Sequence, residues 1–180
     1  KRPEFYPDTL PPVINIGPGS PTGTTFGYGA KFPAKYQDAM YILDWSWGKI
    51  HAVHIIPNGS SYTATKETFI TGSPLPVTDA IIHPDDGAMY FTIGGRRVQS
   101  GLYRVTYVGK ESTALVKHKP NVNELARLRH RLEQFHGRQH SDALNAAWPH
   151  LDHPDRFVRW AALTAVQHQP LAQWKNRALN

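Results

Sequence analysis

The feature that most restricts the fold of this chain is an internal repeat of about 50 residues. The tripeptide AMY occurs at 39–41 and again at 88–90, and the apolar run IHAVHI (50–55) is matched by LYRVTY (102–107). A repeat of this length, built from short antiparallel strands, is typical of the blades of a β-propeller. Because two blades cannot close a ring or protect their edges, we expect the other blades to come from a longer protein or from other chains.

Short apolar bursts alternate with turn residues through the first 109 positions. The bursts are AMYIL (39–43), KIHAVHII (49–56), ETFIT (67–71), TDAII (78–82), AMYFTI (88–93) and GLYRVTYV (101–108). The segments between them, PNGSS (57–61), GSPLP (72–76), PDDG (84–87) and IGGRR (93–97), are rich in the residues that tight turns require. This pattern predicts antiparallel strands, and the repeat groups them into two blades over residues 13–109.

The last third of the chain has a helical composition. Thirteen of the 14 glycines and all eight tyrosines precede residue 110, whereas Ala, Leu, Arg and Gln gather after residue 120. The helical segments are NVNELARLRHRLEQFHG (121–137), DALNAAW (142–148) and DHPDRFVRWAALTAVQHQP (152–170). Asn121 or Asn123 can cap the first helix, and Asp152 can cap the third. We therefore expect a helical region over residues 121–180.

Charge and composition exclude several kinds of site. The formal net charge is +6, and residues 110–180 carry eleven Lys/Arg against six Asp/Glu. Because these charges alternate in sign along the expected helices, we interpret them as a solvated surface and expect no nucleic-acid partner. The absence of cysteine excludes disulfides, thiolate metal sites and covalent haem attachment within this chain. No apolar run reaches the roughly 18 residues of a membrane span, and no signal peptide is visible.

Two runs carry a resemblance to a known family. They are GPGSPTGTTFGYGAKFPAKYQDAMYILDWSWGKIHAVHI (17–55) and TDAIIHPDDGAMYFTIGGRRVQSGLYRVTY (78–107). They resemble successive blades of the pyrroloquinoline-quinone-dependent sugar dehydrogenases (soluble glucose/aldose dehydrogenase-like). The resemblance implies a β-propeller that binds pyrroloquinoline quinone and calcium when complete, with no cofactor held within this chain alone. The chain departs from the family in LPVTDA (75–80), which keeps Asp79 but lacks the Arg expected before it.

The helical region resembles a second kind of repeat. HPDRFVRWAALTAV (153–166) fits the D-x-x-V-R-x-x-A pattern of HEAT-type helical repeats. A sugar-dehydrogenase-like propeller followed by HEAT repeats is similar to large exported proteins of planctomycete-type bacteria, which often end in a c-type cytochrome domain. The resemblance implies a periplasmic or extracellular location, a haem c elsewhere in the parent protein and a cytochrome partner. The corresponding division is an extended linker (1–12), two β-propeller blades (13–109), a linker (110–120) and a HEAT-like helical region (121–180).

Loops of the expected blades place six side chains on one face. The loops are 17–24, 43–49, 73–78 and 92–100. We predict that Asp44, Trp45 and Trp47 bind a ligand. We predict that Asp79, Arg96 and Arg97 bind the cofactor. Guanidinium groups pair with carboxylates, of which the quinone carries three, and tryptophan faces suit a sugar ring or a planar quinone. The alternatives are that Asp44 satisfies loop N–H groups and that the arginines belong to a solvated loop.

The histidines of the first repeat do not predict a metal site. His51 and His54 are three residues apart, and such positions on a strand point to opposite faces. We therefore expect no metal ligands here, and no catalytic residue is assigned because the base and calcium ligands of the family lie in earlier blades.

Three functions stay open at this point. The first is the C-terminal part of an exported dehydrogenase that passes electrons from a quinone to a cytochrome, with this segment inactive alone. The second is a non-catalytic propeller and HEAT scaffold that binds glycan or protein, which the missing Arg before Asp79 favours. The third, a nucleic-acid binder, depends on net charge alone.

Overall fold

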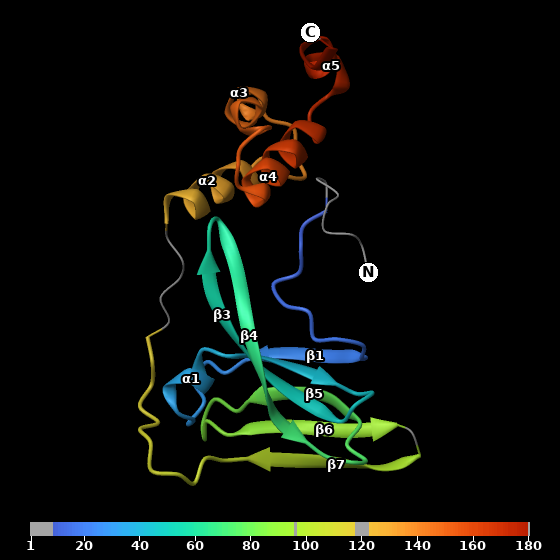
Figure 1. Cartoon of the computed structure of the whole chain (residues 1–180), viewed down its shortest axis with the longest axis vertical. Helices are drawn as coiled ribbons and strands as arrows, with labels where there is room; N and C mark the ends of the chain where they lie inside the picture. Colours follow the sequence, from blue (N-terminus) through green and yellow to red (C-terminus); the bar gives the residue numbers. More distant parts are fainter. Residues whose placement is uncertain (1–8, 96, 118–122, 180) are drawn as a thin grey trace. The chain divides into compact units, whose positions relative to one another are not determined.

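The computed structural model describes residues 9–95, 97–117 and 123–179, which form two compact units (Figure 1). The sheet unit holds the described residues of Val13–Ile56 and Thr63–Lys119, and the helical unit holds those of Lys1–Pro12, Pro57–Tyr62 and Pro120–Asn180. Arg96, one of the predicted cofactor ligands, lies outside the described residues.

Two antiparallel sheets build the sheet unit. The strands are β1 (Pro21–Phe26), β2 (Met40–Asp44), β3 (Lys49–Asn58), β4 (Ser61–Thr71), β5 (Val77–Ile82), β6 (Met89–Gly95) and β7 (Val98–Val105), and the short helix α1 spans Ala34–Gln37. The first sheet has the order β1-β2-β3-β4, and the second has the order β5-β6-β7. Each sheet is thus a meander in which neighbours in sequence are neighbours in space.

The two sheets repeat the same strand pairing. Met40 pairs with Val53 between β2 and β3, and Met89 pairs with Val105 between β6 and β7. A register shift also occurs at the equivalent point of the first pair of strands in each sheet. The repeat in the sequence is therefore a repeat of strand register.

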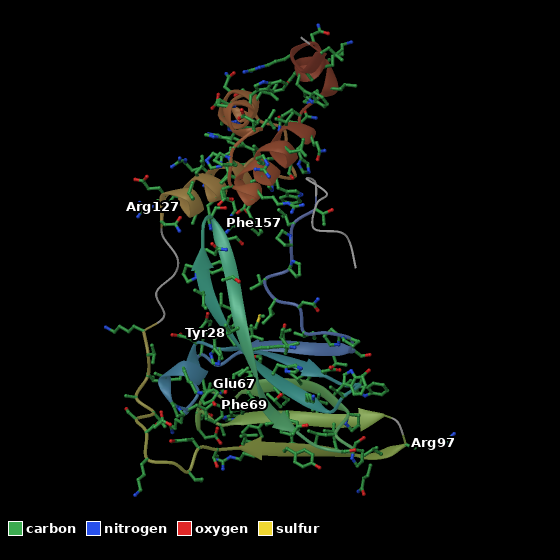
Figure 2. The ribbon with its side chains drawn as sticks, in the orientation of Figure 1. Tyr28, Glu67, Phe69, Arg97, Arg127 and Phe157 are labelled. Carbon is green, nitrogen blue, oxygen red and sulfur yellow. The ribbon has the colours of Figure 1, made fainter. Side chains whose placement is uncertain are left out.

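The core of the sheet unit lies between the two sheets. The buried side chains that meet there include Tyr41, Leu43, Ile50 and Ala52 from the first sheet and Val77, Ala80, Met89, Phe91 and Ile93 from the second. Phe69 of β4 packs on Tyr41 with ring centroids 4.9 Å apart (Figure 2). Because side chains alternate along a strand, the other face of β2 and β3 points away from this core. We call that face, which carries Ile42, Asp44, Lys49 and His51, the outer face.

The segment expected to be a linker is held against the sheet unit. The buried side chain of Gln37 donates from Nε2 to the carbonyl of Ala114 at 2.9 Å, and its Oε1 accepts the N–H of Val116 at 3.0 Å. A buried amide that satisfies two backbone groups fixes the path of residues 114–116 on this unit.

The helical unit has a core of small residues. Its elements are α2 (Glu124–Glu133), α3 (Ala143–Ala147), the 3₁₀ turn η1 (Trp148–His150), α4 (Arg156–Gln167) and α5 (Leu171–Leu179). The buried core consists of Leu132, Ala147, Val158, Ala161, Ala162, Ala165 and Val166. Asn123 caps α2 by accepting the N–H of Ala126 at 2.8 Å. Asp155 caps α4, so the prediction that Asp152 does so is wrong.

Asp155 also holds a turn that belongs to the helical unit. Its carboxylate accepts the N–H of Ser60 at 2.8 Å and the hydroxyl of Ser60 at 2.7 Å. The same group accepts the N–H groups of Phe157 at 2.9 Å and Val158 at 3.2 Å. Burial alone would raise the pKa of Asp155, but these four hydrogen bonds together hold the pKa below its ordinary value.

The predicted fold class, two β-propeller blades followed by HEAT-like helical repeats, is wrong. Over the described residues the chain is a mixed α/β arrangement of a four-stranded sheet, a three-stranded sheet and five short helices, without a closed propeller or an extended helical repeat region. The second sheet has three strands among the described residues, one fewer than a blade. The PDDG run (84–87), interpreted as a mark of a blade, specifies only the turn between β5 and β6. The helices share a single core instead of stacking as successive equal pairs.

Candidate functional site

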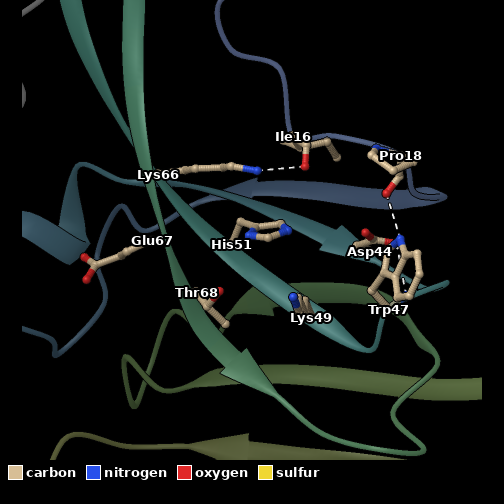
Figure 3. A pocket seen from close by; sticks show the side chains of 9 residues that line it. All are labelled: Ile16, Pro18, Asp44, Trp47, Lys49, His51, Lys66, Glu67 and Thr68. Atoms are coloured by element: carbon tan, nitrogen blue, oxygen red, sulfur yellow. Dashed lines mark hydrogen bonds between the residues drawn. The ribbon is translucent and has the colours of Figure 1, made fainter.

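The outer face of the first sheet carries the candidate site. Asp44 pairs with Lys49 and Ile42 pairs with His51 across β2 and β3, so all four side chains share this face. A pocket of about 340 Å³ opens on it (Figure 3). Its lining residues are Ile16, Pro18, Asp44, Trp47, Lys49, His51, Lys66, Glu67 and Thr68. The pocket lies entirely within the sheet unit.

Asp44 organises the turn at one end of the pocket. Its side chain is buried, and Oδ1 accepts backbone N–H groups from Ser20 at 3.1 Å, Ser46 at 3.0 Å and Trp47 at 3.4 Å. A side chain at Gly19 would collide with the carboxylate, so glycine permits this close approach. Three donors on one oxygen satisfy the carboxylate in place and fix the position of Trp47.

Trp47 forms the rim of the pocket. Its indole N–H donates to the carbonyl of Pro18 at 2.7 Å, and yet the side chain is 58% exposed. Trp47 also lines a second pocket of about 240 Å³, which is bounded by residues 45–48 and 72–76. A large aromatic ring is therefore held by its polar edge while its apolar surface stays open.

The second carboxylate of the pocket, Glu67, is engaged outside it. Its Oε1 lies 2.8 Å from Nε2 of His54 and 3.2 Å from Nζ of Lys35. The hydrogen bond with His54, aided by that with Lys35, lowers the pKa of Glu67. Figure 3 shows the Glu67 side chain pointing to the opposite side of β4 from Lys66 and Thr68. Its charge is thus balanced before any ligand arrives.

The cationic side chains of the pocket lack carboxylate partners. Lys66 donates from Nζ to the carbonyl of Ile16 at 2.7 Å, and Lys49 makes neither a hydrogen bond nor an ion pair with any residue that the structure describes. His51 is 7% exposed between them. Burial lowers the pKa of His51, and the charge of Lys66 and then of Lys49 lowers it further against the opposing effect of Asp44.

The five predicted site residues that the structure describes do not all line one pocket. Asp44 and Trp47 meet in the pocket, whereas the indole of Trp45 donates to the carbonyl of Gly94 at 2.9 Å. Asp79 is exposed on β5, and its Oδ1 accepts the N–H of Ala80 at 2.8 Å. Arg97 is exposed in the turn between β6 and β7 with a φ of 60° (Figure 2). Two of the expected loops, 43–49 and 92–100, do meet through the contact between Trp45 and Gly94.

Sequence reasoning missed Lys49 and Lys66 and considered His51 only as a metal ligand. His51 faces the pocket, whereas His54 lies beside Glu67 and the ring of Tyr36 on the other side of the sheet. The signal that could have found these residues is alternation, since Lys49 and His51, like Lys66 and Thr68, are two apart on a strand and share a face.

The described part of the chain offers neither a metal centre nor a membrane-spanning helix. Across the residues that the structure describes, no group of three or more His, Asp or Glu side chains could hold a metal ion. None of the helices seen over residues 9–95, 97–117 and 123–179 has the length and apolar character needed to traverse a bilayer. Comparison of the chain with protein-family models, with curated proteins and with solved structures finds no match.

Proposed function

We propose that the sheet unit is a non-catalytic module that binds a glycan in the pocket on its outer face. The observation that carries this proposal is Trp47, which is 58% exposed although its indole N–H is already bonded to Pro18. A tryptophan fixed in this way offers its ring to the apolar face of a sugar without first having to become ordered. The lining groups of His51 and Thr68 supply polar partners for the sugar hydroxyls.

The state of the two carboxylates supports binding over hydrolysis. Glycoside hydrolysis uses a pair of carboxyl groups that face the bond to be broken, one of them free to give or take a proton. Asp44 accepts N–H groups from Ser46 and Trp47 of its own turn and from Ser20 before β1, and Glu67 is paired with His54 and Lys35. Both carboxylates therefore serve the fold of the pocket wall.

The dehydrogenase function inferred from the sequence stays a prediction. Its quinone, calcium and haem, its cytochrome partner and its exported location are untested, and two of the residues expected to bind quinone, Asp79 and Arg97, are exposed. Titration of the protein with pyrroloquinoline quinone and calcium, followed by quinone absorbance, tests it. Uptake that is lost in the Arg97→Gln variant would support the prediction, and absence of uptake would leave glycan binding as the better account.

A glycan array with variants of Trp47 tests the proposal. We expect the protein to bind at least one class of immobilised oligosaccharide and Trp47→Ala to weaken that binding by about tenfold or more, since an aromatic contact of this kind is a typical binding hot spot. Trp47→Phe should retain most of the affinity because it keeps an apolar ring. Tyr28→Ala, which removes another exposed aromatic from the same unit, is the matched control and should bind normally. Unchanged binding by Trp47→Ala would overturn the proposal.

A further inference from the structure

We infer that the sugar bound in this pocket is anionic, and that Lys49 and Lys66 recognise its carboxylate or sulfate group. This inference rests on the proposed function, since it concerns the same pocket. It adds the chemical class of the ligand and assigns specificity to two lysines that are not needed to hold the sheet together.

The balance of charges in the pocket is the first argument. Both carboxylates are satisfied by the protein, Asp44 by backbone N–H groups and Glu67 by Lys35 and His54. Neither Lys49 nor Lys66 has an ion-pair partner among the described residues. The pocket therefore contains two ammonium groups that form no ion pair with its carboxylates, although its lining includes as many acidic residues as lysines.

The placement of the lysines is the second argument. Lys49 begins β3, two residues after Trp47, and pairs across the strand with Asp44. Lys66 reaches from β4 toward the carbonyl of Ile16 on the far side of His51 (Figure 3). A sugar ring stacked on Trp47 thus has the ammonium group of Lys49 nearby and that of Lys66 on the other side of His51. An oxyanion substituent on that ring would gain charge-assisted hydrogen bonds that a hydroxyl cannot give.

The buried imidazole of His51 is the third argument. It lies between the two lysines and is 7% exposed. The charged and titratable groups that face it are Lys66, Lys49 and Asp44. Burial is the main cause of its lowered pKa, and the ammonium groups of Lys66 and Lys49 lower that pKa further against the opposing effect of Asp44. An anion placed between the two lysines would also lie beside this imidazole, whose ring N–H can donate to it.

Calorimetric titration with matched neutral and anionic sugars tests the inference. The probes are a galacturonate oligomer, its fully methyl-esterified form and a sulfated galactan oligomer, each at low and moderate salt. We expect an anionic oligomer to bind at least tenfold more tightly than the ester, with affinity that falls as salt rises. The galacturonate and sulfated arms distinguish the two sources of negative charge, and tighter binding of either one supports the inference.

Variants assign the effect to the lysines. Lys49→Gln should reduce anionic binding about tenfold, as expected for loss of one charge-assisted hydrogen bond, and should leave binding of the methyl ester unchanged. Lys66→Gln should have a similar effect, with a thermal melt to verify that the segment around Ile16 is intact. Lys110→Gln, at an exposed position in the same unit, is the control. If the ester and the anion bound equally, and both lost affinity in Trp47→Ala, the inference would be overturned and the proposed function would stand. Absence of binding by every oligomer would overturn both.

Discussion

The two sheets have the same strand register but turn opposite faces toward the core that they share. Leu43 pairs with Ile50 in the first sheet, and the equivalent residues Thr92 and Leu102 pair in the second. Leu43 and Ile50 are fully buried, whereas Leu102 is 69% exposed. The sheets therefore stack front to back: one face of the first sheet packs against the opposite face of the second. Identical backbone pairing leaves the choice of the buried face to the side chains.

The candidate site arises where the repeats differ most. The positions that correspond to Asp44, Lys49 and His51 are Ile93, Gly101 and Tyr103 in the second repeat. Ile93 belongs to the core and Tyr103 stacks on Phe91 with ring centroids 5.0 Å apart. The same face is thus packed in one repeat and polar in the other. Because the first repeat does not use this face to pack against the second sheet, it is free to carry charged groups.

Substitution at equivalent core positions is expected to give the largest difference between the repeats. Leu43→Ala should lower the free energy of unfolding by about 3 kcal/mol, because it leaves a cavity in a fully buried site. Its counterpart Thr92→Ala should cost less than about 0.5 kcal/mol, because Thr92 is exposed. Urea unfolding followed by circular dichroism measures both. Similar losses in the two variants would contradict the assignment of opposite buried faces.

The second difference is that, over the described residues, only the first sheet has a fourth strand, β4. The carboxylate of Asp155 holds the turn that precedes this strand. Asp155→Ala should lower the free energy of unfolding by about 2 kcal/mol, since it removes a helix cap and leaves the N–H of the buried Ser60 without its acceptor. Asp152→Ala, at the exposed acid three residues earlier, is the matched control and should have little effect. A loss in Asp152→Ala as large as in Asp155→Ala would contradict this account.

The lowered pKa of Asp155 predicts that the free energy of unfolding depends on pH in the acid range. Because the folded-state pKa of Asp155 is lowered, its contribution to stability is present above the unfolded-state pKa of about 4 and is lost as the pH falls through the folded value. Unfolding free energies measured from pH 6 to pH 3 should therefore converge for the wild type and Asp155→Ala. If the difference in unfolding free energy between the two proteins stayed constant with pH, the charge of Asp155 would not contribute to stability.

Removal of Asp44 is expected to have a smaller effect on stability and a larger one on binding. Asp44→Ala should cost about 1 kcal/mol, because the N–H groups of Ser20, Ser46 and Trp47 lose their acceptor but lie in partly exposed segments where they can bond to water. The loop should also release Trp47, so affinity for the glycan should fall with it. Thermal melts and titration measure the two effects. Full retention of affinity would show that Asp44 does not position Trp47.

Substitution of His51 is expected to have the smallest effect on stability. That effect is visible only when stability is measured as a function of pH. The folded-state pKa of His51 is lowered, so the unfolded chain takes up a proton first and stability decreases as the pH falls from about 6.5 toward the folded value. His51→Gln should remove this decrease. Melting temperatures between pH 7.5 and pH 5 provide the test. An unchanged slope in His51→Gln would place the acid sensitivity elsewhere.

Much of the sheet unit could be predicted from the sequence, because its signals are local. The repeated AMY triplets mark β2 and β6, and the six apolar bursts overlap strands β2 to β7. The opposite orientation of His51 and His54 likewise follows from alternation along a strand. Residues 21–24 were expected to be a loop but belong to β1, since this glycine- and threonine-rich stretch becomes a strand only through pairing with β2.

The rest depended on information that a local pattern does not contain. A period of about 50 residues fixes the unit that repeats, but it does not state whether the units close a ring or stack as a pair. The pocket is likewise non-local, since it combines the turn at Trp47 with Lys66 of β4 and with Ile16 before β1. Asp44 was identified because the repeat placed its loop, residues 43–49, on the face expected to carry the site, whereas lysines on strands are common and carry no such signal.

Mapping of the ligand by nuclear magnetic resonance tests most directly the claim that the outer face of the first repeat is the binding surface. Titration of ¹⁵N-labelled protein with galacturonate or sulfated galactan oligomers should shift the amide signals of Lys49, His51 and Lys66 and the indole signal of Trp47. The equivalent positions of the second repeat, Gly101 and Tyr103, should stay unchanged. Shifts concentrated at Arg97 and Asp79, or shifts of equal size in both repeats, would contradict the account.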